Sequence, residues 1–210
     1  MLDLAYLPRV KCGSVQGGAC GNGAVAKSFY IAMNGDAERL TRFFAGGVDD
    51  EGRTFDEILG WDDARLEMVH DYIQWIFPLP ERSGANPWAP VLDARTIAAI
   101  RSSAEMQGRL RAAFLRMLAF YGFVLEGAAV VEGPRFAVAS RNWLHAGNHN
   151  HLRLTRILRS LRVLGLEGEA AALWEALRGL YERETAAGRR TITQETFAFW
   201  RQAATGTLRD

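Results

Sequence analysis

Apolar residues recur at spacings of three and four along most of the chain beyond residue 35, and this period predicts helices. The clearest case is residues 102–121, where one face is wholly apolar and carries Met106, Leu110, Ala113, Phe114, Met117, Leu118 and Tyr121. Ser102 and Glu105 have the spacing of a capping box at its start, and Gly122 is expected to end it. Such a stripe of methionine and aromatic residues is typical of a packed core rather than of a cofactor pocket.

Residues 61–92 join two different patterns. Leu66, Val69, Ile73 and Ile76 share one side of an amphipathic helix that is expected to begin at Asp62 or Asp63. Pro78 is expected to end this central helix, because proline has no amide hydrogen and restricts the residue before it. The next segment, residues 78–92, has the composition of an ordered irregular loop, with Gly84, Asn86, Trp88 and the prolines Pro78, Pro80, Pro87 and Pro90. We call it the proline loop, and we expect the other helices to pack around it and the central helix.

Shorter periodic runs before and after this segment predict further helices, each with a capping residue. Asp36 is expected to cap a helix that runs through Phe44. Thr54 and Glu57 have the spacing of a capping box for a short helix. Asp93 is expected to cap the helix that follows the proline loop.

The C-terminal part of the chain predicts another group of helices. Asn148 or Asn150 is expected to cap the first, whose inward positions are Leu154, Ile157, Leu158, Leu161 and Leu164. The next is expected over about residues 167–187, and the last is expected to begin at Thr191 and Gln194.

Strand signals are weak and local. The runs FVLEGAAVV and RFAVA favour a loop or a short hairpin near residues 124–139, around Gly133 and Pro134. The expected fold class is therefore all-α, a single compact orthogonal domain of about seven helices over residues 36–205. Residues 1–35 contain six glycines and little periodicity, and we expect them to form a poorly ordered Gly-rich leader before that domain.

A family resemblance rests on the sequence HDYIQWIFPLPERSGANPWAPVL, residues 70–92. It resembles the signature of the opioid growth factor receptor conserved domain, in which a similar core precedes a proline-rich loop. Residues 109–123 and 142–166 agree with that family in the same order, so the resemblance spans roughly residues 40–200. It implies peptide-receptor activity without assigned catalytic residues, and for the eukaryotic members it implies action at the nucleus.

Composition and charge exclude several classes of protein. The chain has 210 residues, 49% of them hydrophobic, which is enough to bury a sizeable core. With 25 basic and 24 acidic residues, no bulk field would recruit nucleic acid or a membrane. The charges are uneven, however: residues 49–67 contain eight acids, and residues 135–162 contain six arginines and no acid. We expect these two segments to complement each other within one fold.

The chain shows no pattern for export or membrane insertion. No apolar run has the length of a membrane span, and the start lacks a signal-peptide pattern, so we expect a cytoplasmic protein. Cys12 and Cys20 are expected to be free thiols there, and two cysteines cannot complete a structural zinc site.

The start of the predicted helix after residue 148 is the first candidate site. His149, Asn150, Arg153 and Arg156 lie in its first turns, where unpaired amides and the helix dipole favour an anion. Two guanidinium groups on one side of a helix could converge on a carboxylate or phosphate of a peptide or small anionic ligand. The alternative is that Arg153 and Arg156 bind Asp62, Asp63 or Glu67 of the acidic segment.

The second candidate site combines His70, Tyr72, Gln74 and Trp75 of the central helix with Trp88 of the proline loop. His70 and Gln74 lie four apart and would either face a groove or anchor the proline loop through its backbone. Trp75, Phe77 and Trp88 would form an aromatic wall that could also receive an apolar side chain of a peptide.

The three neighbouring histidines His145, His149 and His151 suggest a metal site, but no carboxylate or cysteine lies nearby in the sequence. We therefore expect capping and hydrogen-bonding roles for them, with no metal and no cofactor.

These patterns favour a non-enzymatic binding module related to the opioid growth factor receptor domain. One alternative is an enzyme in which His70 or His149 acts as acid or base and Arg153 clamps an anion. A second is nucleic-acid binding through the arginine-rich residues 135–162. The sequence names neither the ligand nor the oligomeric state.

Overall fold

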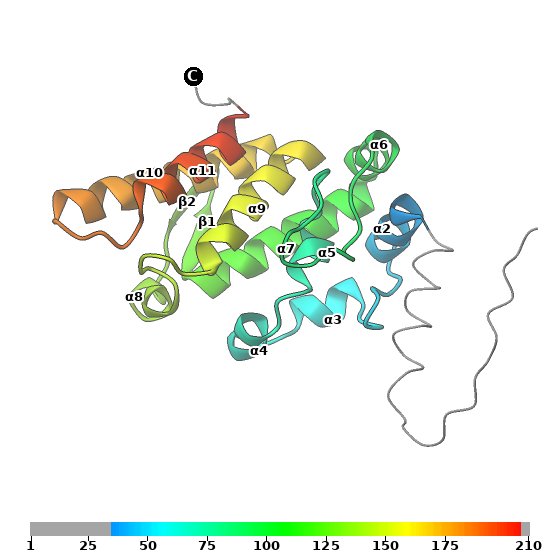
Figure 1. The fold of residues 1–210 in the computed structure, drawn as a ribbon, viewed down its shortest axis with the longest axis horizontal. Helices are drawn as coiled ribbons and strands as arrows, with labels where there is room; N and C mark the ends of the chain where they lie inside the picture. Colours follow the sequence, from blue (N-terminus) through cyan, green and yellow to red (C-terminus); the bar gives the residue numbers. More distant parts are fainter. Residues whose placement is uncertain (1–34, 207–210) are drawn as a thin grey trace, which may run out of the picture. The chain divides into compact units, whose positions relative to one another are not determined.

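The computed structural model describes residues 35–206, and helices dominate them (Figure 1). In chain order the elements are α2 (Asp36–Phe44), α3 (Phe55–Leu59), α4 (Asp63–Met68), α5 (Ile73–Ile76), α6 (Ala94–Ser102), α7 (Ala104–Tyr121), β1 (Phe123–Glu126), β2 (Ala129–Glu132), α8 (Phe136–Ala139), the 3-10 helix η1 (Ser140–Asn142), α9 (Asn150–Leu164), α10 (Glu167–Ala186) and α11 (Gln194–Thr205). The expected all-α class is confirmed. The described part contains ten α-helices rather than about seven, mainly because the expected central helix is divided into α4 and α5 and the run RFAVA contributes α8. The expectations for the leader and its two cysteines lie outside the described residues.

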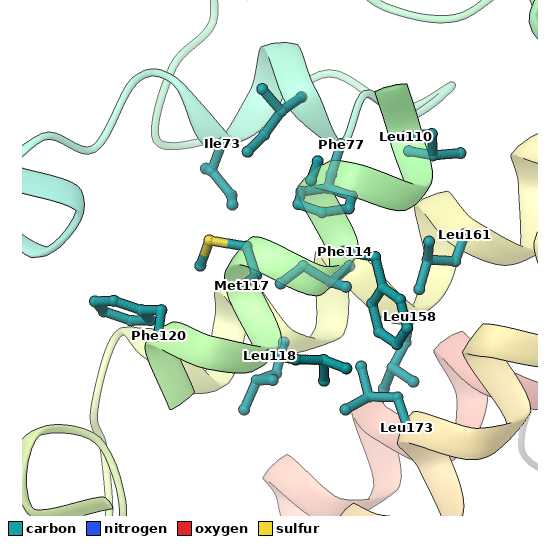
Figure 2. Close-up of a cluster of buried hydrophobic side chains, with 14 of the residues drawn as sticks. Ile73, Phe77, Leu110, Phe114, Met117, Leu118, Phe120, Leu158, Leu161 and Leu173 are labelled. Carbon is teal, nitrogen blue, oxygen red and sulfur yellow. The ribbon is translucent and has the colours of Figure 1, made fainter. Parts of the chain in front are cut away.

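Helix α7 runs through the core (Figure 2). Its predicted apolar face is buried except for Met106, which is half-buried, and Leu110, Ala113 and Phe114 have no exposed surface. Figure 2 shows the helices that cover this face, with Phe77 after α5, Leu158 and Leu161 on α9, and Leu173 on α10. Burial of each leucine or phenylalanine side chain stabilises the fold by roughly 1.5–3 kcal/mol, so burial of this face is a main source of stability.

Aromatic rings join α2, α3 and α5. The ring centroid of Phe43 lies 5.2 Å from those of both Phe55 and Trp75. Arg39, also on α2, has only 1% of its surface exposed and stacks its guanidinium 5.2 Å from the Trp75 ring. Arg39 also forms ion pairs with Asp36 and Asp50 and donates to the carbonyl oxygen of Trp88 at 3.1 Å. This buried cation therefore ties α2 to the proline loop.

Helix α9 packs against both α10 and α11. The indole nitrogen of Trp200, on α11, donates to the carbonyl oxygen of His151 at 3.0 Å, and Arg162 donates to that of Ala203 at 3.0 Å. All five predicted inward leucine and isoleucine positions of α9 are buried, and Gly165 ends the helix with a φ of 97°. The periodicity therefore placed this helix correctly.

The hairpin lies earlier than expected. Its strands pair Glu126 with Ala129, so the turn falls at Gly127 and not at Gly133 and Pro134. The run RFAVA, for which a loop or one strand of that hairpin was expected, contains α8 instead. Pro134 has no amide hydrogen with which to continue the ladder, and the amide of Gly133 instead donates to the carbonyl oxygen of Gly122 at 2.9 Å.

Several helix starts differ by one or two residues from the predicted ones. Thr54 with Glu57, Asp62 and Asp93 cap their helices as expected. Asp36, however, lies inside α2, and the caps of α7 and α11 are Ser103 and Thr193 rather than Ser102 and Thr191. Ser102 instead donates to the carbonyl of Ala99 and Thr191 to the carboxylate of Glu184. The N-cap position of α9 is His149, with Asn148 just before it and Asn150 inside the helix.

The prediction of one continuous central helix is wrong. Residues 69–72 separate α4 from α5, and Val69 has an extended backbone with φ −89° and ψ 131°. The apolar spacing survives this break because Leu66, Ile73 and Ile76 are all buried. The break is stabilised by a side chain of α9, described below.

We predict that Gly122→Ala destabilises the protein more than Gly127→Ala. Both glycines have positive φ, 86° and 59°, where a Cβ costs roughly 1–2 kcal/mol. A Cβ at Gly122 would also lie 2.7 Å from the Cα of Phe136, whereas at Gly127 it meets nothing within 4 Å. Urea unfolding should therefore show a further loss of roughly 1–3 kcal/mol for Gly122→Ala. Equal losses would contradict the close packing of α8 on the end of α7.

Candidate functional site

The guanidinium of Arg153 occupies the break between α4 and α5. Its Nη1 donates to the carbonyl oxygen of Leu66 at 3.0 Å, and its Nη2 donates to those of Val69 at 3.0 Å and Glu67 at 3.4 Å. Only 5% of Arg153 is exposed. A helix leaves its last carbonyls without intrahelical partners. In a continuous helix, backbone amides of the next turn would donate to these carbonyls. At the break, the guanidinium of Arg153 donates to them instead.

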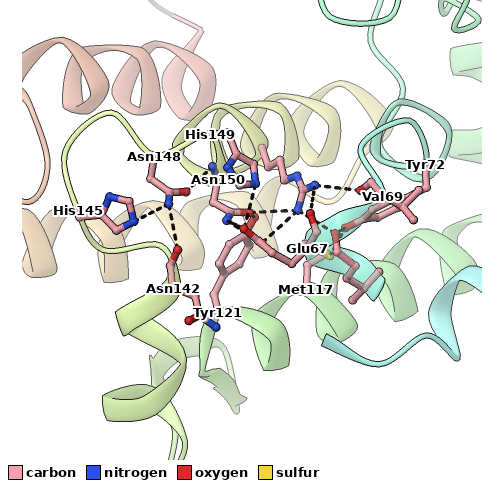
Figure 3. Close-up of polar contacts among 12 residues, drawn as sticks. Glu67, Val69, Tyr72, Met117, Tyr121, Asn142, His145, Asn148, His149 and Asn150 are labelled. Atoms are coloured by element: carbon pink, nitrogen blue, oxygen red, sulfur yellow. Dashed lines mark hydrogen bonds and ion pairs between the residues drawn. The ribbon is translucent and has the colours of Figure 1, made fainter. Parts of the chain in front are cut away.

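Asn150 connects this guanidinium to α4 and α7 (Figure 3). Its Oδ1 accepts from Arg153 at 3.2 Å and from the hydroxyl of Tyr121 at 3.4 Å, while its Nδ2 donates to the Glu67 carboxylate at 3.0 Å. Its backbone amide donates to Oδ1 of Asn148 at 2.8 Å. Asn150 is fully buried with its hydrogen bonds made inside the protein, so its role in this arrangement is structural.

Tyr72 lies in the same cluster. Its hydroxyl donates to the carbonyl oxygen of Leu66 at 3.2 Å, and Met117 lies 3.9 Å away. Burial raises the pKa of Tyr72 to about 12, so the hydroxyl remains a donor at neutral pH. The carbonyl of Leu66 at the break therefore accepts from a neutral donor, the Tyr72 hydroxyl, as well as from the charged guanidinium of Arg153.

Two histidines lie at the surface beside this cluster. Nε2 of His149 is 3.2 Å from Oε1 of Glu67, and the rings of His149 and His70 are 5.1 Å apart. Desolvation lowers the pKa of His149, while the Glu67 carboxylate opposes that shift. The side chain of His149 is 42% exposed and remains accessible to a ligand.

A groove with a volume of about 480 Å³ opens beside the histidines, between α9 and the proline loop. Its lining includes five of the eight predicted site residues, namely His70, Gln74, His149, Arg153 and Arg156. Apolar surface predominates, with contributions from Ile73, Leu79 and Leu152. Leu152 is 69% exposed, which leaves an apolar side chain in contact with solvent at the groove.

The guanidinium of Arg156 differs from that of Arg153 in its partners. Its Nη1 donates to the carbonyl oxygen of Phe77 at 3.1 Å, and within residues 35–206 it forms no ion pair with a carboxylate. Burial lowers the pKa of Arg156 to about 10, so the group still carries its charge at neutral pH. Arg159, one turn further along α9, pairs with Glu81 of the proline loop.

The proline loop is held by hydrogen bonds along its length. The hydroxyl of Ser160 donates to the carbonyl of Pro78 at 2.9 Å, and the amide of Leu92 donates to that of Leu79 at 2.9 Å. Arg82 donates to the carbonyl of Pro87 at 2.7 Å. The loop is therefore a fixed wall of the groove.

The predicted aromatic wall does not form. Trp75 is 3% exposed and packs on Phe43, Phe77 is fully buried, and Trp88 is 63% exposed. The break before α5 places Trp75 in the core, where it cannot receive a ligand. Gln74 bonds to the break and not to the backbone of the proline loop: in the orientation that satisfies its amide, it donates to the carbonyl oxygens of Asp71 at 3.1 Å and His70 at 3.3 Å.

Arg153 and Arg156 do not converge on one anion, because each donates to different backbone carbonyls. Of the acids expected to bind them, Glu67 lies 3.7 Å from Arg153, whereas Asp62 caps α4 and Asp63 pairs with Arg116 and Arg135. The acidic and arginine-rich segments thus meet through Glu67 and Asp63. Sequence reasoning missed Leu152, Arg159 and Ser160, although they lie on the same helix, α9, as three of the predicted residues.

The three histidines expected near each other face different neighbours. His145 accepts from the side-chain amide of Asn148 at 2.8 Å, and His149 faces Glu67. His151 is 3% exposed and lies between the rings of Trp143 and Trp200, at 6.3 and 5.4 Å. Between residues 35 and 206 no three potential ligands gather as a metal site, and no helix there is long and apolar enough to cross a membrane.

Residues 48–200 match the family described as "Opioid growth factor receptor (OGFr) conserved region". The chain is 41% identical over 148 residues to the rat opioid growth factor receptor, covering 67% of this chain and 25% of that protein. It is 41% identical over 155 residues to the human receptor, covering 67% of this chain and 21% of that protein. The mouse opioid growth factor receptor-like protein 1 is 32% identical over 185 residues, which cover 74% of this chain and 38% of that protein.

The chain therefore spans between about a fifth and two fifths of the length of these relatives. No solved structure matches it.

We predict that acid destabilises the protein in part through His151. Burial lowers the pKa of His151 to about 4 from an ordinary value of 6.5. The folded state then keeps this imidazole neutral while the unfolded state takes up a proton, so stability falls as the pH drops from 6.5 to 4. This loss is on the order of 3 kcal/mol. His151→Phe should flatten the dependence of urea stability on pH in that window, whereas His145→Phe, at an exposed position, should not; matching slopes for the two variants would contradict the assignment.

We also predict that Arg153→Met lowers the free energy of unfolding by roughly 3–5 kcal/mol, because it removes a largely buried cation beside Glu67 together with its hydrogen bonds to the carbonyls of Val69 and Glu67. Arg153→Lys should cost less, since one ammonium reaches some of them. Arg111, whose side chain is 49% exposed and pairs with Glu169, provides the control. Arg111→Met should cost at most about 1 kcal/mol in the same urea titration. An Arg153→Met cost no larger than that would show that the break does not need the guanidinium.

Proposed function

The chain belongs to the opioid growth factor receptor conserved-region family, and we propose that it is a ligand-binding module that holds a short peptide in the groove between α9 and the proline loop. The relatives are named as receptors, and "opioid growth factor" is the ligand in their names. The observation that carries the proposal is the open, mostly apolar groove beside a loop fixed by hydrogen bonds. Grooves of this kind suit an extended ligand with apolar side chains.

The walls of the groove support this role through their rigidity. The proline loop is tied to α9 by Ser160 and to α2 by Arg39. A preformed site loses less conformational entropy when a ligand binds, so more of the contact energy appears as affinity. Leu152 contributes exposed apolar surface that a ligand side chain would cover.

An enzymatic role has one feature in its favour, the pair of histidines at the groove with Glu67 beside His149. A nucleophile activated by such a base would hydrogen-bond to it. In the described part of the chain no hydroxyl or thiol bonds to either imidazole, and Glu67 already accepts from Asn150. The relatives are named as receptors, which also favours binding over catalysis.

Nucleic-acid binding through residues 135–162 has less support. Arg135 and Arg159 pair with Asp63 and Glu81, respectively. Arg153, Arg156 and Arg162 donate to backbone carbonyls. A phosphate backbone requires a row of accessible cations, and here most of these guanidinium groups already have partners within the protein.

The proposal predicts peptide binding that depends on Leu152. Opioid growth factor and a pool of randomised pentapeptides are titrated against the chain by isothermal calorimetry. Leu152→Glu should weaken the affinity of a binding peptide at least roughly tenfold, because it replaces apolar contact surface with a charge. The matched control is Val138→Glu on α8, where the original side chain is 64% exposed and does not line the groove.

Val138→Glu should leave the affinity unchanged, and both variants should melt near the wild-type temperature. Absence of binding by every peptide would refute the proposed function. If both variants weakened the affinity equally, the peptide would bind at a place other than the groove.

A further inference from the structure

Arg156 is a cation that, among residues 35–206, pairs with no carboxylate, and its setting is partly apolar. Its guanidinium lines the groove and donates a hydrogen bond to the carbonyl oxygen of Phe77. An ionised group that is largely removed from water is stabilised by an opposite charge. The carboxylate that lines the groove with Arg156 is that of Glu81, and it pairs with Arg159 instead. Burial lowers the pKa of Arg156, and the charge that opposes this shift belongs to Glu81.

Glu81 reaches the same region of the groove from the proline loop. Its carboxylate pairs with Arg159, and it also lines the groove with Arg156. The side chains of Glu81 and Arg159 are 56% and 32% exposed. An exposed ion pair is worth at most about 1 kcal/mol, so an incoming carboxylate can replace Glu81 at low cost.

We propose that Arg156 and Arg159 form a subsite for the C-terminal carboxylate of the bound peptide, and that Glu81 is an internal competitor which this carboxylate displaces. The inference rests on the proposed peptide-binding function of the groove and specifies which end of the peptide it recognises. Bidentate guanidinium–carboxylate bonds are among the strongest that a protein forms with an anion. Glu81 already places a carboxylate beside Arg159, which demonstrates that the space admits one.

The surroundings of the two arginines favour a chain terminus over an acidic side chain. Ile73, Leu79 and Leu152 line the groove together with Arg156. A C-terminal residue carries its carboxylate and its side chain on the same Cα, so an apolar last residue can meet a cation and an apolar wall at once. An aspartate or glutamate within a peptide presents its carboxylate without an apolar side chain beside it.

The experiment compares matched peptides that differ only in charge at the last residue. Pentapeptides with four randomised positions and a C-terminal leucine are made as free acids and as C-terminal amides. The best binder from either pool is then measured in both forms by isothermal calorimetry with wild type, Arg156→Gln, Glu81→Gln and Glu182→Gln. Glu182 pairs with Arg178 on α10 and does not line the groove, so it controls for the loss of a surface carboxylate.

Wild type should bind the free acid roughly tenfold or more tightly than the amide, the range for a hydrogen bond to a charged group. Arg156→Gln should remove most of this preference, because it weakens binding of the free acid more than binding of the amide. Continued binding of the amide would also show that the variant is folded. Glu81→Gln should raise the affinity for the acid roughly two- to fivefold, as expected from release of an exposed ion pair, and leave the amide unaffected. Glu182→Gln should change neither.

The possible failures separate the two proposals. If acid and amide bind wild type equally, or if Arg156→Gln weakens both forms equally, the carboxylate subsite is wrong and the peptide groove stands. If Glu81→Gln lowers the affinity for the acid, Glu81 assists binding and is not a competitor. If neither form of any peptide binds wild type, the proposed function itself fails.

Discussion

The buried guanidinium of Arg153 is the interaction on which the rest of the candidate site depends. The chain stops being helical after Met68 and begins again at Ile73, and the carbonyls of Leu66, Glu67 and Val69 all accept from this one side chain. Buried carbonyls without donors would cost roughly 1–3 kcal/mol each. A single arginine with several donors in a fixed planar geometry meets this requirement, which a lysine cannot match.

The same helix then shapes the groove. Arg153, Arg156 and Ser160 follow one another at helical spacing on α9, and they contact the break, the end of α5 and the start of the proline loop, respectively. One face of α9 thus fixes three successive points of a segment that has little regular structure of its own. The groove lies along this contact, so its shape follows from the register between α9 and that segment.

Sequence patterns predicted the parts of this fold that depend on local physics. Thr54 with Glu57, Asp62, Asp93 and the apolar face of α7 are local signals, and each appears in the structure as expected. The central helix failed because Leu66, Ile73 and Ile76 keep a helical spacing although the backbone between them is not helical. The donor that makes this break stable comes from a residue 84 positions away from Val69, and periodicity contains no information about such a contact.

In the candidate site, too, some of the predicted residues lie at the groove and others do not. The pattern identified five residues that line the groove, but it placed Trp75 at the ligand when the separate turn of α5 buries it against Phe43. In the described part of the chain, Arg153 bonds to the carbonyls of the break and lies beside Glu67, whereas Arg156 pairs with no carboxylate. This distinction also needs the fold, since both arginines look alike in sequence. Family membership and helical class could therefore be predicted from the sequence. Which arginine holds the break and which one is open to a ligand could not.

The most direct test of this account is amide hydrogen exchange, measured by mass spectrometry on Arg153→Lys beside the wild type. If the guanidinium holds the break and thereby the groove, protection should fall in residues 66–92 while α10 and α11 exchange as in the wild type. Unchanged exchange in residues 66–92, or an equal loss of protection throughout the chain, would contradict it.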